Sequence, residues 1–383
     1  MSIPTIDQQP SEPSLDGPLP VPDLASRSAL AGHCYQRWAQ SWEAAAQPAS
    51  SDVTLSPMQL VAWWQACDAA FERRSSQRAA AVYAGARPVA LAPLCKSSRR
   101  WQLWQEPPGA RRLYEPSEFL HRSDPALDAM AEQLVASRTA LVLPRVLMQS
   151  ATAKSLQRAY RGRGRVVCRP SGGCPYIEID PTVAEAELLL SKRLRSDLRR
   201  ARRKADQLGD VQFEIAAPLS ENDFAGEFER FLEIEAAGWK GASGTAVGRD
   251  PDMERFFRQF GAAATRQGIL RFAWMHIERA RVAGQLAIES GRRFWLLKIG
   301  FDEQYAKCSP GQLLMLETLR YAMQQGLVSY EFLGNAADWT RRWTATERET
   351  IELALFPPGL RGMLAYSAWL AQKAYGRWRR GRA

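Results

Sequence analysis

The segment 293–326 constrains the fold of this chain more than any other, because it combines a buried strand with a clearly marked helix. The apolar run 294–300 predicts the strand, and a short polar loop follows it. Ser309 stands where a helix N-cap belongs, Pro310 occupies the first helical position, and Gln312 completes a capping box. The segment therefore predicts a strand–loop–helix unit within an α/β core.

A strand that leads into a helix N-terminus directs several backbone N–H groups toward one point. That point suits a phosphate or another anion. The same unit is also common in α/β cores that bind nothing there, with Pro310 and Gly311 serving only the helix. The segment alone leaves both interpretations open.

Length and composition limit the class of protein. A chain of 383 residues is long enough for two domains, each with its own core. The formal net charge of +10 favours anionic partners: phosphates, nucleic acid or a membrane surface. Six cysteines without a CxxC pair and only three histidines argue against a metal site and indicate a reducing compartment. The sequence shows neither a secretory signal nor an apolar run of transmembrane length, so we expect a cytoplasmic protein.

Changes in composition divide the chain into five expected parts. They are a disordered proline-rich leader (1–34), a first folded domain (35–180), a basic linking helix (181–209), a second domain (210–358) and a basic C-terminal helix (359–383). After residue 210 the expected order of elements is a strand, two helices, three strands, a helix, a strand, a short helical segment and a last strand.

The most basic stretch runs from Ser191 to Gly209 and carries eight lysines and arginines. One apolar stripe at helical spacing lies between them, which predicts a helix docked on one face with its basic face outward. The stripe comprises Leu194, Leu198, Ala201, Ala205 and Leu208. Such a charge density favours nucleic acid, another polyanion or the phosphates of a bound ligand. A solvated helix that joins two domains is the alternative.

The tail from Leu360 onward is also expected to be helical, with Met363 and Leu364 on its apolar side and arginines crowded at its end. A basic amphipathic helix can lie on anionic lipid. The alternative is a helix packed on its own domain with a solvated tip.

Several stretches resemble a known family. "SKRLRSDLRRARRKADQLGDV", "AAGWKGASGTA", "VAGQLAIESGRRFWLLKIGFDEQYAKCSPGQLLMLETLRYA" and "WTRRWTATE" are similar to the CelD/BcsL-like acetyltransferases of the GNAT superfamily, relatives of the FemABX peptidyltransferases. The resemblance covers roughly 190–356, and 35–180 matches only in layout. It implies an α/β fold with two tandem GNAT-like domains, in which mixed central sheets are flanked by helices and the first domain is divergent.

The resemblance also implies an acyl-CoA site at the turn where the helix begins. The cofactor-binding residues would be Ile299, Gly300, Ser309, Gly311, Gln312, Leu313 and Leu314, acting through backbone N–H groups and the helix dipole. The usual GNAT phosphate signature has several glycines, whereas Gly311 alone remains here and Pro310 removes one donor. In the FemABX branch the acyl donor is an aminoacyl-tRNA instead.

Acyl transfer to an amine needs a base, a donor for the oxyanion and a proton for the leaving thiolate. Asp302, just beyond the central strand, and Glu331, in the next strand, are the candidate bases. Tyr305 has a hydroxyl suited to protonating the thiolate. Lys298 lies between apolar neighbours, so we expect it to contact a ligand or to pair with one of the two carboxylates. Each of these side chains could equally be structural.

The acceptor site is expected to involve Trp239 and Lys240, which match the family motif, together with Glu289 and Asn335. Glu289 is a third candidate base. The alternatives are a core anchor for Trp239 and a turn cap for Asn335.

These observations predict an acyl-CoA-dependent acyltransferase that acts on an amine or hydroxyl by direct attack on the thioester, without metal. The resemblance implies a small-molecule, sugar or polysaccharide-precursor acceptor. Two alternatives stay open. One is FemABX-like transfer from aminoacyl-tRNA, which the basic helix favours, and the other is a non-catalytic polyanion-binding or scaffold protein that retains the fold.

Overall fold

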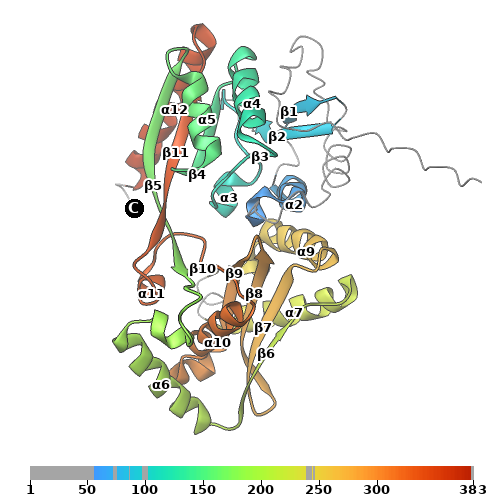
Figure 1. Cartoon of the computed structure of the whole chain (residues 1–383), viewed down its shortest axis with the longest axis vertical. Helices are drawn as coiled ribbons and strands as arrows, with labels where there is room; N and C mark the ends of the chain where they lie inside the picture. Colours follow the sequence, from blue (N-terminus) through green and yellow to red (C-terminus); the bar gives the residue numbers. More distant parts are fainter. Residues whose placement is uncertain are drawn as a thin grey trace, which may run out of the picture.

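The fold is described from a computed structural model, which covers residues 56–71, 76–85, 87–96, 102–238, 244 and 246–380. It is the mixed α/β fold that the sequence predicts, and two sheets lie within these ranges (Figure 1). The larger sheet has eight strands in the order β4-β11-β5-β10-β9-β8-β7-β6, and the smaller has the order β1-β2-β3. The predicted disordered leader (1–34) lies outside the described residues.

The N-terminal region alternates helices with strands. Its elements are η1 (Pro57–Gln59), α2 (Val61–Phe71), β1 (Ser76–Ala84), β2 (Arg87–Lys96), α3 (Ala110–Leu113), β3 (Leu120–His121), α4 (Asp124–Ala136), β4 (Leu141–Leu147), α5 (Ala151–Tyr160), β5 (Arg165–Glu178), η2 (Ala186–Leu189) and α6 (Lys192–Asp206).

The predicted order of elements after residue 210 is confirmed. The elements are β6 (Val211–Ala216), α7 (Glu221–Ala237), η3 (Val247–Arg249), α9 (Pro251–Arg266), β7 (Leu270–Ile277), β8 (Ala280–Ser290), β9 (Arg293–Phe301), η4 (Glu303–Cys308), α10 (Pro310–Gln324), β10 (Ser329–Glu331), α11 (Asp338–Arg341), β11 (Glu347–Phe356) and α12 (Leu360–Arg380). The short η4 turn occupies most of the expected polar loop between β9 and α10.

The long strand β5 lies between β11 and β10 in the larger sheet. It pairs antiparallel with β11 along most of its length and with β10 near its end (Figure 1). β11 in turn lies between β5 and β4 and is antiparallel to both. The last strand of the expected second domain is therefore shared with strands of the first, and the boundaries at 180 and 210 stay a prediction.

Two apolar layers cover the faces of β7, β8 and β9. Helices α7 and α9 pack on one face with Trp274 and Trp295, and α2 extends this layer by placing Trp63 against Phe256 and Phe260. Helices α10 and α6 pack on the other face. Because residues of β9 alternate between the two layers, the strand is held on both sides and its end is fixed in position.

Two predicted helix faces need correction. On α6, the first four members of the predicted stripe are buried, but Leu208 is 54% exposed because the helix ends at Asp206. On α12, Met363 and Leu364 are 58% and 61% exposed, and Trp369 is buried against β11 instead. No helix among the described residues combines the length and apolarity needed to span a bilayer.

Candidate active site

Strands β9 and β10 run side by side only where they begin. They are parallel and pair at Arg293–Trp295 with Ser329–Glu331. β9 then continues to Phe301, whereas β10 ends at Glu331. The two strands therefore part after the pair Trp295–Glu331, and helix α10 begins close to the free end of β9.

A cavity of about 450 Å³ lies between the end of β9 and the start of α10. We call it the β9–α10 cavity. Its lining includes Glu235, Ile299, Gly300, Ser309, Gly311, Gln312, Trp339 and Arg342. Five of the seven predicted cofactor-binding residues are thus brought together. Leu313 and Leu314 are the other two, and their side chains are buried in the core beneath α10.

The predicted capping box at the start of α10 is wrong. Ser309 has left-handed backbone angles (φ 50°, ψ 54°), and its hydroxyl makes no capping hydrogen bond. Its carbonyl accepts the first hydrogen bonds of the helix, from the amides of Gln312 and Leu313, at 3.0 and 3.2 Å. The amide of Gly311 has no acceptor within the described chain. This geometry leaves the Ser309 hydroxyl exposed and one N–H available at the mouth of the cavity.

Helix α7 closes the other side of this cavity by close backbone approach. A Cβ on Gly300 would lie 2.8 Å from the Cα of Glu235, and one on Gly238 would lie 2.6 Å from the carbonyl oxygen of Phe301. Glu235 is 1% exposed, and its carboxylate accepts a 2.8 Å hydrogen bond from the amide of Val247. The two glycines therefore let β9 and α7 meet at the cavity wall.

A second cavity, of about 560 Å³, lies where β10, β5 and β11 meet the N-terminal region. We call it the seam cavity. Its lining includes Glu118, Tyr176, Arg293, Trp295, Glu331, Leu333, Glu347, Arg348 and Glu349. Both members of the last β9–β10 pair belong to this lining, whereas the end of β9 lines the first cavity. The seam cavity therefore borders the point where the strands part, and the β9–α10 cavity lies farther along β9.

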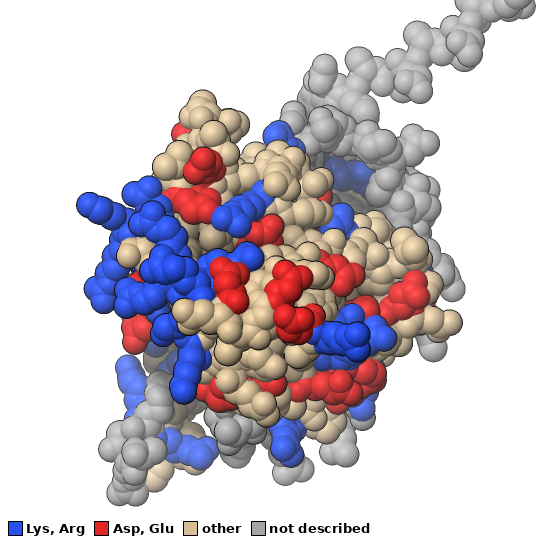
Figure 2. Space-filling model, turned by 90° about the horizontal axis from the view of Figure 1, so that it is seen from below, with Lys and Arg blue, Asp and Glu red and all other residues tan. Residues whose placement is uncertain are grey.

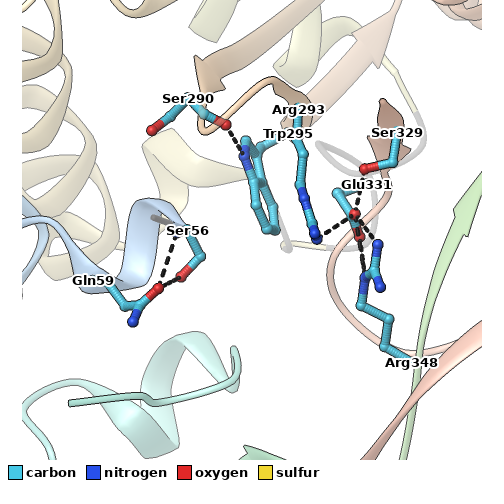
Figure 3. A network of polar contacts seen from close by, with 8 residues as sticks. All are labelled: Ser56, Gln59, Ser290, Arg293, Trp295, Ser329, Glu331 and Arg348. Carbon is cyan, nitrogen blue, oxygen red and sulfur yellow. Dashed lines mark hydrogen bonds and ion pairs between the residues drawn. The ribbon is translucent and has the colours of Figure 1, made fainter. Parts of the chain in front are cut away.

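Glu331 is held by two arginines at the wall of the seam cavity (Figure 3). Arg348 binds it through two nitrogens, with Nη2 at 2.6 Å and Nε at 3.0 Å from the two carboxylate oxygens. Arg293 Nη1 lies at 3.2 Å and Ser329 Oγ at 2.6 Å from the same oxygen, Oε1. Glu331 is 2% exposed, so this buried carboxylate is fully engaged by charged and polar donors.

Two further carboxylates approach the parting strands from the loop after α3. Burial raises the pKa of Glu118 to about 7, although Ser150 and Arg293 counteract the shift. Its Oε1 is buried without a hydrogen bond. Burial likewise raises the pKa of Glu115 to about 7, against the amide of Gly334 and the charge of Lys298. Both groups are therefore poised to exchange a proton near neutral pH.

The four expected catalytic side chains do not gather at one point. Asp302 caps η4 by accepting a 2.9 Å hydrogen bond from the amide of Gln304. Tyr305 packs against the core beneath α10. The nitrogen of Lys298 lies 5.3 Å from the ring centre of Phe257, on the α9 side of β9. Glu331 lies in the seam cavity, as described above.

The expected acceptor residues are also dispersed. Glu289 forms a 3.0 Å ion pair with Arg271 and accepts a 2.9 Å hydrogen bond from Tyr321, at the opposite end of β9 from the first cavity. Asn335 is exposed and follows β10, beside Gly172. Trp239 and Lys240 lie outside the described residues.

A basic face stands next to the β9–α10 cavity. The exposed side of α6 carries Lys192, Arg193, Arg199, Arg200, Arg202, Arg203 and Lys204. Seen from below, lysines and arginines crowd the side of the molecule where α6 lies (Figure 2). A groove between α6 and α11 is lined by Arg193, Arg341 and Arg342, and Arg342 also lines the first cavity. Phosphates entering that cavity would pass these arginines.

Four residues near the two cavities were not expected from the sequence: Glu115, Glu118, Arg145 and Glu235. One signal was available for Arg145, because a single charge interrupts the apolar strand Leu141–Leu147. The two glutamates flank Pro116 in a loop, where nothing local indicates which strands they face. Within the described ranges, no three His, Cys, Asp or Glu side chains gather as a metal site would require.

Parallel strands that part beside a helix N-terminus, within this order of elements, define a GNAT-type fold. The sequence agrees: residues 192–341 match the family model described as an acetyltransferase (GNAT) domain. This part of the chain therefore carries a GNAT domain. No curated protein matches the chain.

Solved structures share the fold over most of the chain at low sequence identity. The C-terminal domain of a putative lysylphosphatidylglycerol synthetase from Agrobacterium fabrum has a TM-score of 0.55 at 11% identity, covering 89% of this chain and 96% of that one. The structure of FemX has a TM-score of 0.53 at 11% identity, covering 83% of this chain and 95% of that one. A conserved protein of unknown function from Bacteroides thetaiotaomicron has a TM-score of 0.51 at 10% identity, covering 84% of this chain and 97% of that one.

Proposed function

We propose that this protein is an acyltransferase of the CelD/BcsL-like type. It would transfer an acetyl or longer acyl group from acyl-CoA to a small-molecule, sugar or polysaccharide-precursor acceptor. The observation that carries the proposal is the parting of β9 and β10, with the seam cavity at the last strand pair and the β9–α10 cavity farther along β9. Such an arrangement offers one site for the donor and another for the acceptor.

The donor would occupy the β9–α10 cavity. Its pyrophosphate would lie at the start of α10, where the amide of Gly311, the hydroxyl of Ser309 and the helix dipole favour an anion. Gln312 lines the same cavity, and its Oε1 is buried without a hydrogen bond. Leu313 and Leu314 would contribute through the backbone of this turn. The acyl arm would run along Ile299 and Gly300 toward the parting strands.

The acceptor would enter the seam cavity, and Glu118 would be the base. Unlike Glu331, whose two oxygens already accept hydrogen bonds from arginine, Glu118 has an oxygen without a donor. Asp302 is occupied as the cap of η4. We therefore assign Glu331 to holding Arg293 and Arg348 in place, and proton removal to Glu118.

The reaction with an amine then balances as follows. The ammonium group gives one proton to Glu118, and the nitrogen lone pair attacks the thioester carbonyl carbon. The new C–N bond forms, the C–S bond breaks, and the sulfur leaves with the electron pair. The nitrogen gives its second proton to solvent, and the thiolate takes up a proton from solvent, because Tyr305 packs in the core beneath α10. Lys298 would supply positive charge near the oxyanion.

Calorimetry with acetyl-CoA tests the donor site. We expect micromolar binding that Gly311→Trp abolishes, because the indole would fill the mouth of the cavity. Gly226→Trp is the matched control, since Gly226 is exposed on α7 with open space around it. Absence of acetyl-CoA binding by the unmodified protein would refute the acyl-CoA donor.

The pH dependence of thiol release from acetyl-CoA, with a panel of amino sugars and diamines, tests the base. The rate should rise with pH through about 7, because Glu118 must be ionised to accept a proton. Glu118→Gln should lower the rate by about 10²-fold or more. Glu115→Gln removes a carboxyl with a similarly raised pKa and should leave the pH profile in place. An unchanged profile in Glu118→Gln would remove it from this role.

A second candidate donor is aminoacyl-tRNA. The α6 basic face and the arginine groove beside the β9–α10 cavity favour it, since both suit a larger polyanion than CoA. Bulk tRNA should then bind in a salt-dependent manner. Neutralising Arg199 and Arg203 with glutamine should reduce the slope of log K against log salt by about two. Binding of neither acetyl-CoA nor tRNA would favour the non-catalytic alternative.

A further inference from the structure

Helix α12 docks on the sheet by one narrow face. Trp369 and Ala365 are buried against β11, and Gly362 lies so close to Pro357 that no Cβ would fit between them. Lys373, on the same side, forms an ion pair with Glu352 of β11. The orientation of the helix is therefore fixed, and its opposite face is directed outward (Figure 1).

Seven of the eight residues aligned along that outward face are apolar, and Ser367 is the exception. The residues at successive spacings of three or four are Leu360, Leu364, Ser367, Ala371, Tyr375 and Trp378, and Met363 and Ala374 lie beside them. We call these eight residues the α12 stripe. Leu360 is 75% exposed, Leu364 61% and Tyr375 59%. Single exposed hydrophobic residues are ordinary on a protein surface, but a continuous stripe over a helix of 21 residues marks an interaction surface.

The charges around the stripe indicate what covers it. The helix contains no acidic residue, whereas Arg361, Arg377 and Arg379 are exposed on it. A second copy of the chain placed on this face would bring like charges together. An anionic lipid surface satisfies both features, because the headgroups meet the arginines and the acyl boundary receives the apolar side chains.

The aromatic residues fit the same partner. The rings of Tyr375 and Trp378 are stacked, with their centres 5.9 Å apart, and both are more than half exposed. Such amphipathic rings prefer the level of lipid headgroups, where one edge is apolar and the other wet. They lie toward the end of the helix where the arginines are most dense.

We propose that α12 binds the surface of an anionic membrane, lying in the plane of the interface with its stripe inserted and its docked face holding the catalytic domain at the lipid. This inference is independent of the proposed donor and acceptor. It depends on the exposed side of one helix rather than on either cavity.

Co-sedimentation of the full chain with vesicles tests it. We expect binding to vesicles of equal phosphatidylcholine and phosphatidylglycerol, and at least about tenfold weaker binding to phosphatidylcholine alone. The double variant Leu360→Ser/Leu364→Ser should weaken binding by about tenfold or more, because two inserted side chains are lost. Arg361→Gln/Arg379→Gln should weaken binding and reduce its salt dependence.

Two controls separate this surface from others. Leu219→Ser removes a leucine that is 94% exposed elsewhere and should change nothing. Arg199→Gln/Arg203→Gln on α6 should leave most vesicle binding in place. Equal sedimentation of wild type and Leu360→Ser/Leu364→Ser would overturn the proposal, as would binding that follows α6 instead. A dimer in light scattering that this double variant dissociates would also overturn it, since the stripe would then belong to a second copy.

Discussion

Arg145 and Gly334 are joined by a hydrogen bond of 2.7 Å from the guanidinium Nη2 to the carbonyl oxygen, although 189 residues separate them in the chain. Arg145 is fully buried on β4 and also donates to the carbonyls of Tyr114 and Gly173 and to the hydroxyl of Thr350. One side chain thus connects β4, β5, β11 and the end of β10. It ties the loop after β10 to strands that border the seam cavity.

Replacing this arginine should be costly. Arg145→Met leaves several buried carbonyl groups without donors, so we expect the free energy of unfolding to fall by about 3–5 kcal/mol. Arg145→Lys keeps the charge but not the planar guanidinium group, so we expect a smaller fall in the free energy of unfolding. Urea denaturation measures both. The exposed Arg158, which pairs with Asp128, is the control, and Arg158→Met should cost under about 1 kcal/mol. Equal losses at the two positions would refute the role of Arg145.

The close approach of β9 to α7 gives a second prediction. Gly300→Ala forces a Cβ to within 2.8 Å of the backbone of Glu235, so the helix must move away from the strand. We expect a loss of about 1–3 kcal/mol in unfolding free energy and weaker acetyl-CoA binding. Gly226→Ala, in the open part of the same helix, should instead stabilise it by up to about 1 kcal/mol. Unfolding curves that coincide for the two variants would contradict this.

Glu331 gives a third prediction, which separates its two possible roles. Glu331→Gln leaves two arginine side chains at the seam cavity without their buried counter-charge, so we expect a loss of about 3–5 kcal/mol. The exposed Glu347→Gln, on β11, should change stability by less than about 0.5 kcal/mol. If Glu331→Gln is as stable as wild type but inactive, Glu331 is the base, as the sequence analysis first suggested.

The raised pKa values give a fourth prediction, on stability against pH. The pKa values of Glu115 and Glu118 are near 7 in the folded state and 4.5 in the reference state, so between these pH values the folded chain holds more protons. The free energy of unfolding should therefore fall as pH rises from about 4.5 to about 7, by up to about 3 kcal/mol for each group. The double variant Glu115→Gln/Glu118→Gln should remove this slope. Parallel curves for wild type and variant would show that neither group is responsible.

The order of elements and the β9–α10 unit could be predicted because their signals are local. Pro310 and the apolar run 294–300 mark a helix start and a strand through nearest neighbours alone. The predicted capping box is absent because it depends on the backbone conformation of Ser309, which the residue types alone do not determine. Ser309 adopts a left-handed conformation after η4, and its hydroxyl makes no hydrogen bond to the amides of the first turn.

The composition of the seam cavity could not be predicted, because its residues are distant in the sequence. Glu331 lies on β10 and Glu118 in the loop after α3, and the two reach one cavity only in the folded chain. The spacing of apolar residues likewise predicted an apolar side on α12, but it did not show which side of the helix faces the sheet. Helix spacing places Leu364 and Trp369 on different faces, and the contact with β11 decides which one is buried.

The position of β11 has a consequence for synthesis of the chain. β4 and β5 do not pair with each other, since β11 fills the space between them, and Thr350 of β11 is 205 residues beyond its partner Arg145. On the ribosome, both neighbours therefore emerge long before the strand that joins them, and each has an unpaired edge until β11 arrives. A chain that ends before β11 therefore lacks the strand that joins β4 to β5 and cannot close its sheet.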